Sequence, residues 1–140
     1  MAVTVLTNAL VIVNGVTLSD HGNQVTVEDM RDKVDVSGFG TANKVYAKGL
    51  GDAVITVKFL QDFAASSVHA TIQPLIASTT GITVEVRPIN AARSATNPAF
   101  LLASAQVFNY KGLDGQIGNA SEVTVAFENT GTAGLTYPTS

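Results

Sequence analysis

Residues 33–62 have the sequence KVDVSGFGTANKVYAKGLGDAVITVKFLQD, and they carry the clearest structural pattern in this chain. Val34 and Val36 alternate with polar residues near the start of this stretch, and Ile55, Val57 and Phe59 do the same near its end. This period of two is typical of antiparallel strands that bury one face. The pattern therefore predicts two half-buried strands that follow one another along the chain.

The connection between these two predicted strands spans residues 38–52 and is punctuated by glycines. It is too long for a tight hairpin turn, and loops of this length in compact domains often carry function. The loop also holds Phe39 and Tyr46, which gain nothing from exposure to water. We therefore expect the loop to contact the surface of another protein molecule.

Composition narrows the possible functions. A chain of 140 residues is long enough to form one domain, residues 1–140, with its own core. Only 14% of the residues are charged, against roughly 25% in soluble domains, which predicts a large uncharged surface of the kind found at interfaces. The net charge of −3 argues against a nucleic-acid binder. The absence of cysteine excludes disulfides and thiolate metal sites, and no segment has the ~20 apolar residues of a membrane span.

Strand patterns recur along the rest of the chain. Asn14-Gly15, between two apolar runs, is a strong hairpin signal. The other predicted strands cover residues 3–7, 9–13, 16–18, 24–28, 82–87, 101–110 and 123–127.

One segment, residues 63–77, has the spacing of a helix instead. Asp62 or Ser66 is expected to cap its start, and Pro74 to end or kink it. Its apolar residues lie three or four apart, on one predicted face: Val68, Ile72, Leu75 and Ile76. The sequence therefore predicts a mainly β protein, an antiparallel β-sandwich or open barrel with one flanking α-helix.

The C-terminal residues 129–140 are rich in glycine, threonine and alanine, and include Leu135 and Tyr137. They show no clear period. Two interpretations remain open for this extended arm: a frayed terminus, or a segment that becomes ordered on a neighbouring subunit.

Residues suited to catalysis or metal binding are sparse. His21 follows Asp20, and we expect a solvated turn histidine in preference to a buried Asp–His pair. His69 is expected to be exposed on the predicted helix. A cluster of acidic residues lacks calcium-loop spacing and is interrupted by basic residues, so it predicts a salt-bridged turn: Glu28, Asp29, Asp32 and Asp35. We predict no catalytic residue, no cofactor and no metal site, and hence no enzyme.

Taken together, these segments resemble the major tail tube proteins of long-tailed, non-contractile bacteriophages over nearly the whole chain. The strongest part is Val34–Gly40, the long loop, Gly49–Asp52 and the strand ending in FLQDFAA at Ala65. Further similar stretches are Arg87-Pro88, SATNP at 94–98 and LDGxxG at 113–118. The chain departs from the family pattern at Thr41 and at Gly51-Asp52, and it carries no appended immunoglobulin-like domain.

The resemblance implies a structural virion protein. Six subunits would form a ring, rings would stack into a tube, and the inner sheets would join edge to edge into one barrel. Its partners would be identical copies, together with tape measure and tail terminator or tip proteins. DNA would pass through the tube without specific binding. The location would be the virion tail, and the host cytoplasm during assembly.

Two sets of residues follow as candidate sites. The contacts between subunits and rings are assigned to the loop and the C-terminal arm: Phe39, Thr41, Asn43, Lys44, Tyr46, Lys48, Leu135 and Tyr137. The lumen is assigned to the polar faces of the two strands that flank the loop: Lys33, Asp35, Ser37, Thr56 and Lys58.

Two other classes of function remain open. One is a monomeric β-sandwich binding module for carbohydrate or a host surface, although the chain has no tryptophan and its tyrosines are scattered. The other is a different virion part, such as a tail terminator or a capsid decoration protein. Fold alone does not separate these functions.

Overall fold

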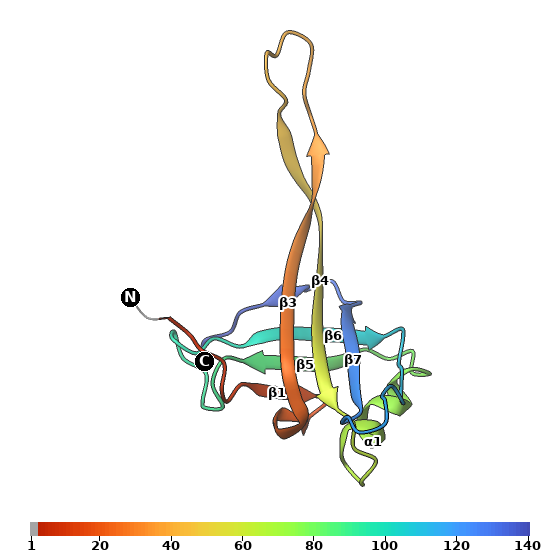
Figure 1. Cartoon of the computed structure of the whole chain (residues 1–140). Coiled ribbons are helices and arrows are strands. Elements are labelled where there is room, and N and C mark those ends of the chain that lie inside the picture. The colour runs from red at the N-terminus through yellow and green to blue at the C-terminus, as the bar shows by residue number, and fades with distance from the viewer. Residues whose placement is uncertain (1–2) are drawn as a thin grey trace.

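The computed structural model describes residues 3–140, which form one curled antiparallel sheet with a long projecting arm (Figure 1). Its strands are β1 (Leu10–Val13), β2 (Val16–Thr17), β3 (Gly22–Asp35), β4 (Tyr46–Leu60), β5 (Ile82–Arg87), β6 (Phe100–Val107), β7 (Glu122–Asn129) and β8 (Leu135–Thr136). The strand order is β2-β1-β5-β6-β7-β4-β3, and β8 pairs with β6. The short helices are α1 (Val68–Ile72) and the 3₁₀ turns η1 (Ser19–His21) and η2 (Gln73–Leu75). The mainly β prediction is confirmed.

The core lies where the sheet folds over itself, with β3, β4 and β7 running across β1, β5 and β6 (Figure 1). Strict alternation along the strands supplies the buried side chains. The predicted apolar faces of β4, β5 and β7 are all buried: Ile55, Val57, Phe59, Ile82, Val84, Val86, Val123, Val125 and Phe127. Burial of such side chains contributes ~25 cal/mol for each Å² of apolar surface removed from water.

β3 and β4 form one long hairpin, so the predicted loop over residues 38–52 is too long. Residues 46–52 belong to β4, and the turn occupies only residues 36–45. Glycines marked this part of β4 as a loop, but Gly49 is needed for a close approach in an extended strand. A Cβ atom at Gly49 would lie 3.0 Å from a methyl carbon of Val34.

The predicted burial of Val34 and Val36 is also wrong. Their exposed fractions are 44% and 53%, because this half of the hairpin projects beyond the sheet. β4 pairs with β7 only from Val54 onward, so the part of the hairpin nearer the turn has no third strand beside it.

The N-terminal strand predicted at residues 3–7 does not form: these residues are irregular and exposed. The Asn14-Gly15 hairpin does form between β1 and β2. Its residues have φ of +49° and +82°, as a two-residue turn of this type requires.

The predicted helix over residues 63–77 is shorter than expected. α1 ends at Ile72, and Pro74 lies at the start of η2, where its ring is tolerated. Val68, Ile72 and Leu75 are buried as predicted, but Ile76 is 40% exposed. Neither expected residue caps α1. Ser67 occupies the cap position, because Ser66 adopts a left-handed conformation (φ +61°) that turns the chain one residue later.

The C-terminal residues fold back on the chain's own sheet, so they are neither a frayed terminus nor a segment that needs a neighbouring subunit to become ordered. Leu135 pairs with Leu102 in β6, and the backbone N–H of Ala99 donates to the carbonyl oxygen of Pro138 (3.0 Å). The Tyr137 hydroxyl donates to Oδ2 of Asp29 on β3 (2.6 Å). This contact ties the end of the chain to the base of the hairpin.

A buried carboxylate holds the loop after β5. Glu85 has 7% of its side chain exposed and forms ion pairs with Arg87 and Arg93. Burial raises the pKa of Glu85, but the hydrogen bonds from Arg93 and Arg87 outweigh burial and leave the pKa below its ordinary value. Asn97 closes the same loop by accepting from the Ile89 N–H (3.0 Å).

We predict that Glu85→Gln lowers the free energy of unfolding by about 3 kcal/mol, because it leaves two arginines facing an uncharged group at a largely buried site. The measurement is urea unfolding followed by circular dichroism. The control is Glu122→Gln, which removes the more exposed ion pair with Lys58 and should change stability little. Equal effects of the two substitutions would contradict this account of Glu85.

Candidate functional site: the hairpin arm and the outer sheet face

The turn at the end of the hairpin has a defined conformation although it stands alone. We call residues 36–45 the arm tip. The N–H of Val36 donates to the Val45 carbonyl oxygen (2.9 Å), and the N–H of Val45 donates to Oγ of Ser37 (2.7 Å). The Thr41 hydroxyl donates to the Gly38 carbonyl oxygen (2.8 Å). These bonds present Phe39 outward with an exposed fraction of 111%.

The stem below the tip is a two-stranded ribbon with little support. Its ladder shifts register between Arg31 and Lys33, a bulge that increases the local twist of the ribbon (Figure 1). The Lys33 ammonium lies 3.9 Å from the centre of the Tyr46 ring. Leu50 is 82% exposed. An isolated two-stranded ribbon is marginally stable in water, so an apolar partner surface would stabilise the arm.

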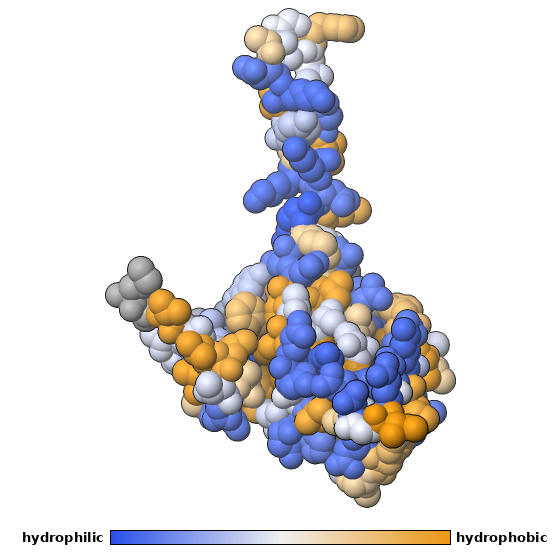
Figure 2. All heavy atoms as spheres, in the orientation of Figure 1, coloured by the Kyte–Doolittle hydropathy of each residue, from blue (hydrophilic) through white to orange (hydrophobic). Residues whose placement is uncertain are grey.

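The electrostatics of the arm are mixed, and Figure 2 shows hydrophilic residues along the stem with hydrophobic atoms at the tip. At the junction of stem and tip, the backbone N–H of Ser37 donates to Asp35 (2.9 Å). This hydrogen bond holds the pKa of the Asp35 carboxyl below its ordinary value, so the group stays ionised near neutral pH.

A second surface is the outward face of β3, β4 and β7, opposite the core. The registers place small polar side chains side by side across it: Thr26 pairs with Thr56, and Lys58 pairs with Thr124. The charged residues of this face are Glu28, Lys58, Glu122 and Glu128. The same registers also place Met30, Val54, Leu60 and Ala126 on this face. The face therefore mixes polar and apolar side chains, and its charge is acidic on balance.

The structure places the predicted contact residues in two locations. Four of them lie in the arm tip, and Tyr46 and Lys48 lie on the adjoining stem of β4. Leu135 and Tyr137 lie apart from the tip, on β8 and just beyond it, beside the base of the hairpin. The four tip residues are Phe39, Thr41, Asn43 and Lys44.

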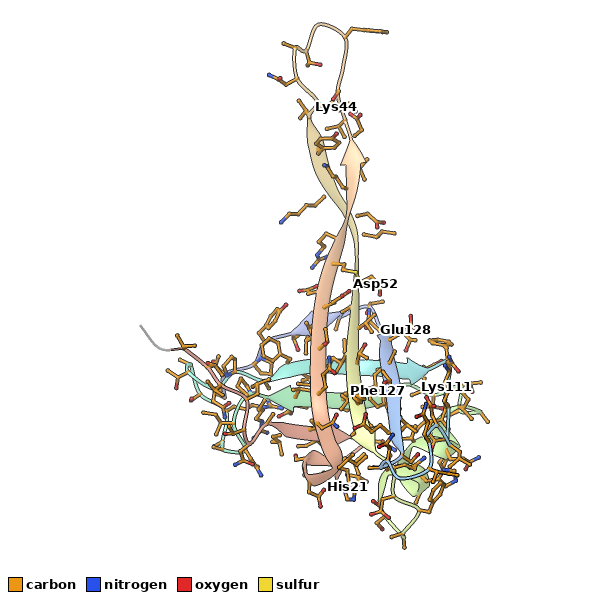
Figure 3. The ribbon with its side chains drawn as sticks, in the orientation of Figure 1. His21, Lys44, Asp52, Lys111, Phe127 and Glu128 are labelled. Carbon is orange, nitrogen blue, oxygen red and sulfur yellow. The ribbon has the colours of Figure 1, made fainter. Side chains whose placement is uncertain are left out.

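The predicted lumen residues do not form one surface. Thr56 and Lys58 lie on the outward sheet face, whereas Lys33 and Asp35 lie on the stem and Ser37 in the tip. The antiparallel register explains this separation. Lys33 pairs with Lys48 and Asp35 with Tyr46, so the 33–37 segment is far along the hairpin from Thr56 (Figure 3 labels Lys44 at the arm and Asp52 at its base).

At the other end of β3, His21 lies between two carboxylates, an arrangement that the sequence patterns did not predict. His21 has only 24% of its side chain exposed, so the expectation of a solvated turn histidine is wrong. Its Nδ1 lies 2.8 Å from Asp20 Oδ1, and its Nε2 lies 2.8 Å from Asp62 Oδ2. Asp62 is 41 residues away, so no local motif could have revealed it. His69 is half-buried against the Tyr110 hydroxyl (2.8 Å), not exposed.

Ser67, His21 and the two aspartates resemble a hydrolytic triad in composition, but the hydrogen-bond partners of the histidine are different. Its Oγ lies 3.3 Å from Nε2 of His21, while Nδ1 faces Asp20. A general base needs an unprotonated nitrogen facing the serine. Here both ring nitrogens point at carboxylates, which only accept hydrogen bonds. The geometry favours a doubly protonated His21, which clasps η1 to the start of the 62–67 loop and cannot take a proton from Ser67.

Partial burial lowers the pKa of His21, but the hydrogen bonds to Asp62 and Asp20 outweigh it and raise the pKa above its ordinary value. The Ala64 N–H, and then the bond from His21, lower the pKa of Asp62. Within residues 3–140 no three acidic or histidine side chains gather as metal ligands. The same part of the chain contains no helix with the length and apolarity to cross a bilayer.

Comparison with known proteins gives a likeness in structure alone. No protein family and no curated protein matches the sequence. A chain from the virion of a native gene transfer agent particle superposes with a TM-score of 0.70 at 10% identity, covering 94% of this chain and 95% of the other. A chain from the tail of an empty gene transfer agent particle, computed with C6 symmetry, gives 0.66 at 10% identity, covering 87% and 86%.

A third solved structure, the six-fold symmetrised baseplate of the anti-feeding prophage, contains a chain with a TM-score of 0.52 and 11% identity. The match covers 99% of this chain and 94% of that one. The protein therefore shares its fold with chains of virion, tail and baseplate assemblies, over nearly the full length of both partners.

We predict that the His21 clasp makes stability depend on pH. Because the pKa of His21 is raised on folding, its contribution is complete below the ordinary pKa of about 6.5 and is lost as the pH rises through the folded value. His21→Gln should remove this decrease in the free energy of unfolding with rising pH. The measurement is urea unfolding at a series of pH values from below 6.5 upward. The control Asp114→Asn, in an exposed loop, should keep the decrease. An unchanged pH slope in His21→Gln would exclude the clasp.

Proposed function

We propose that this protein is a structural, non-enzymatic subunit of a tail tube of the kind found in long-tailed bacteriophages. Identical copies would form six-membered rings, and the rings would stack into a conduit for genome delivery. The fold likeness supports this proposal, because its partners are chains of virion and tail particles. The resemblance of the loop and strand segments described above supports it independently.

The observation that carries the proposal is the arm. It exposes the apolar side chains of Phe39 (111%), Leu50 (82%) and Val45 (48%). A monomer would have no use for holding such a ribbon away from its core, and exposed apolar surface of this kind marks an interaction site. The arm is therefore assigned to contact with another copy, together with the predicted residues Thr41, Asn43, Lys44, Tyr46 and Lys48.

The sheet edges supply the contact within a ring. Within residues 3–140, β3 pairs with β4 alone, so its outer edge carries free backbone donors and acceptors. Free edges invite pairing with another chain. A head-to-tail contact between identical copies closes into a ring when its rotation divides a full turn. Tyr137 contacts β3 through its bond to Asp29, whereas Leu135 pairs with β6. Both residues remain in the proposed subunit interface.

The outward face of β3, β4 and β7 is the proposed lumen lining. It retains Thr56 and Lys58 from the sequence prediction, while Lys33, Asp35 and Ser37 are reassigned to the arm. Three glutamates against one lysine leave the face acidic, so DNA phosphates would find few cations to hold them. DNA would then pass without specific binding.

Several partners follow from the same proposal. Other copies of this chain would build the tube, and tape measure and tail terminator or tip proteins would set its length and its ends. The protein would lie in the virion tail after assembling in the host cytoplasm.

We predict that the purified protein forms rings or tubes as its concentration rises, and that removing the arm stops tube formation without unfolding the sheet. The variant replaces residues 32–50 with Asn-Gly, which joins Arg31 to its register partner Gly51 by a two-residue turn. Negative-stain electron microscopy shows whether rings or tubes form, and a cooperative thermal unfolding transition shows that the sheet is still folded.

The matched control for the shortened arm is Leu113→Ser with Ile117→Ser, which removes exposed apolar side chains (80% and 105% exposed) from a different loop. This variant should still form tubes. The proposed function would be rejected if the full-length protein stayed monomeric at every concentration and salt, and the role of the arm would be rejected if the shortened variant still formed tubes.

We also predict that Thr56→Arg with Thr124→Arg makes assembled tubes retain DNA. Two added cations per subunit on the lumen face would bind phosphates, and retention should fall steeply with salt. The measurement is retention of short labelled DNA by sedimented tubes. The control is Thr83→Arg, at an exposed position of β5 outside the proposed lumen face. Tubes of this variant should bind DNA only on their outer surface. Identical retention by both variants would reject the lumen assignment.

A further inference from the structure

A groove of about 360 Å³ lies at the end of β3 farthest from the arm tip. One wall is the irregular segment Leu6–Ala9, and the other is the start of β3, Gly22–Val25. The core residues Val11 and Val57 form part of its lining. Both valines are almost fully buried, so the accessible apolar surface of the groove comes from Leu6 and the partly buried Ala9 and Val25, among several polar residues. The size of the groove is within the range of ~300–1,000 Å³ found for binding pockets.

The groove and the arm tip complement each other chemically. Among the residues that line the groove, Asp20 alone carries a charge. Its Oδ1 lies 2.8 Å from Nδ1 of His21, and 80% of its side chain is exposed, so a further cation can still approach it. In the arm tip, Lys44 alone carries a charge. The tip also presents a fully exposed aromatic ring at Phe39, and the groove offers accessible apolar surface at Leu6 and Val25.

The positions of the two surfaces favour contact between copies. β3 has 14 residues and at ~3.3 Å per residue spans roughly 45 Å between them. Figure 3 shows this separation, with Lys44 and His21 labelled at opposite ends of the hairpin. The tip cannot reach the groove of its own chain. A tip at one end and a receptor at the other give a head-to-tail contact, which repeats from copy to copy without closing when no rotation returns it to the start.

We propose that the groove between residues 6–9 and 22–25 receives the arm tip of a second copy of this chain. Phe39 enters the groove, and Lys44 lies beside Asp20. This inference rests on the proposed function and deepens it, because it names the surface on the next ring that the arm contacts. It also gives the exposed N-terminal segment a role, since Leu6–Ala9 becomes one wall of the receptor.

The test is a cysteine trap, which is clean because the chain contains no cysteine. Ala42→Cys in the tip and Asn90→Cys at the groove are made in separate preparations, so that Phe39 stays intact. The two are mixed and treated with a short bis-maleimide, and the linked peptides are identified by mass spectrometry. The control pairs Asn90→Cys with Ile117→Cys, an equally exposed loop position. We expect 42–90 links between copies and no 117–90 links.

A second pair of variants tests the groove without altering the tip. In the background of the cysteine pair, Leu6→Lys places a cation opposite Lys44 and removes an apolar wall. We expect about a tenfold lower yield of 42–90 links, which corresponds to ~1.4 kcal/mol in binding. The control Val5→Lys changes a neighbouring residue that is 74% exposed and does not line the groove, and it should leave the yield unchanged.

The outcomes separate this inference from the proposed function. Tubes that form without 42–90 links, or with links that Leu6→Lys and Val5→Lys reduce equally, would overturn the groove as the receptor and leave the tube function standing. Links from Ala42→Cys to another surface would likewise assign the receptor elsewhere. Copies that form 42–90 links in pairs but never build rings or tubes would support the groove and overturn the tube function.

Discussion

The backbone ladder between β3 and β4 is the interaction on which the rest of the structure depends. Its lower half lies within the sheet, where β4 also pairs with β7 and buries Ile55, Val57 and Phe59. Its upper half leaves the sheet as an arm that has no core of its own. The buried half anchors the exposed half, and the bulge after Arg31 sets its twist. The arm is thus an extension of the core strands and not a separate loop.

The same ladder links stability to assembly. A two-stranded ribbon that exposes Phe39 and Leu50 is weakly stable alone, so a second copy that covered it would stabilise it. The free edge of β3 and most of the outward sheet face belong to the same hairpin. In the proposed assembly this one element would present an edge to a lateral neighbour, a face to the lumen and a tip to an axial neighbour. The His21 clasp fixes the start of β3, and the Tyr137–Asp29 bond holds β3 where the hairpin leaves the sheet.

The sequence predicted those parts of the fold that depend on interactions between residues close together in the chain. Alternation identified the buried faces of β4, β5 and β7, and Asn14-Gly15 identified a turn. The prediction from sequence failed where the structure of a segment depends on contacts with distant parts of the chain. Val3 and Val5 alternate like a strand but find no partner within residues 3–140. Gly49 and Gly51 look like loop residues but lie in β4, because this part of the strand pairs with β3 along the hairpin. The residues of the outward face could be identified only from the strand registers. The pairing of His21 with Asp62 could not be predicted because the two residues are 41 positions apart. Neither has a local signature.

The central claim is that copies of this chain complete one another through the β3–β4 hairpin. Cryo-electron microscopy of the polymer formed by the unmodified protein tests it most directly. The account predicts stacked rings in which the outward face of β3, β4 and β7 lines a continuous barrel and each arm reaches the next ring. Rings whose lumen is lined by β1, β5 and β6, or arms that lie free in solvent, would contradict it.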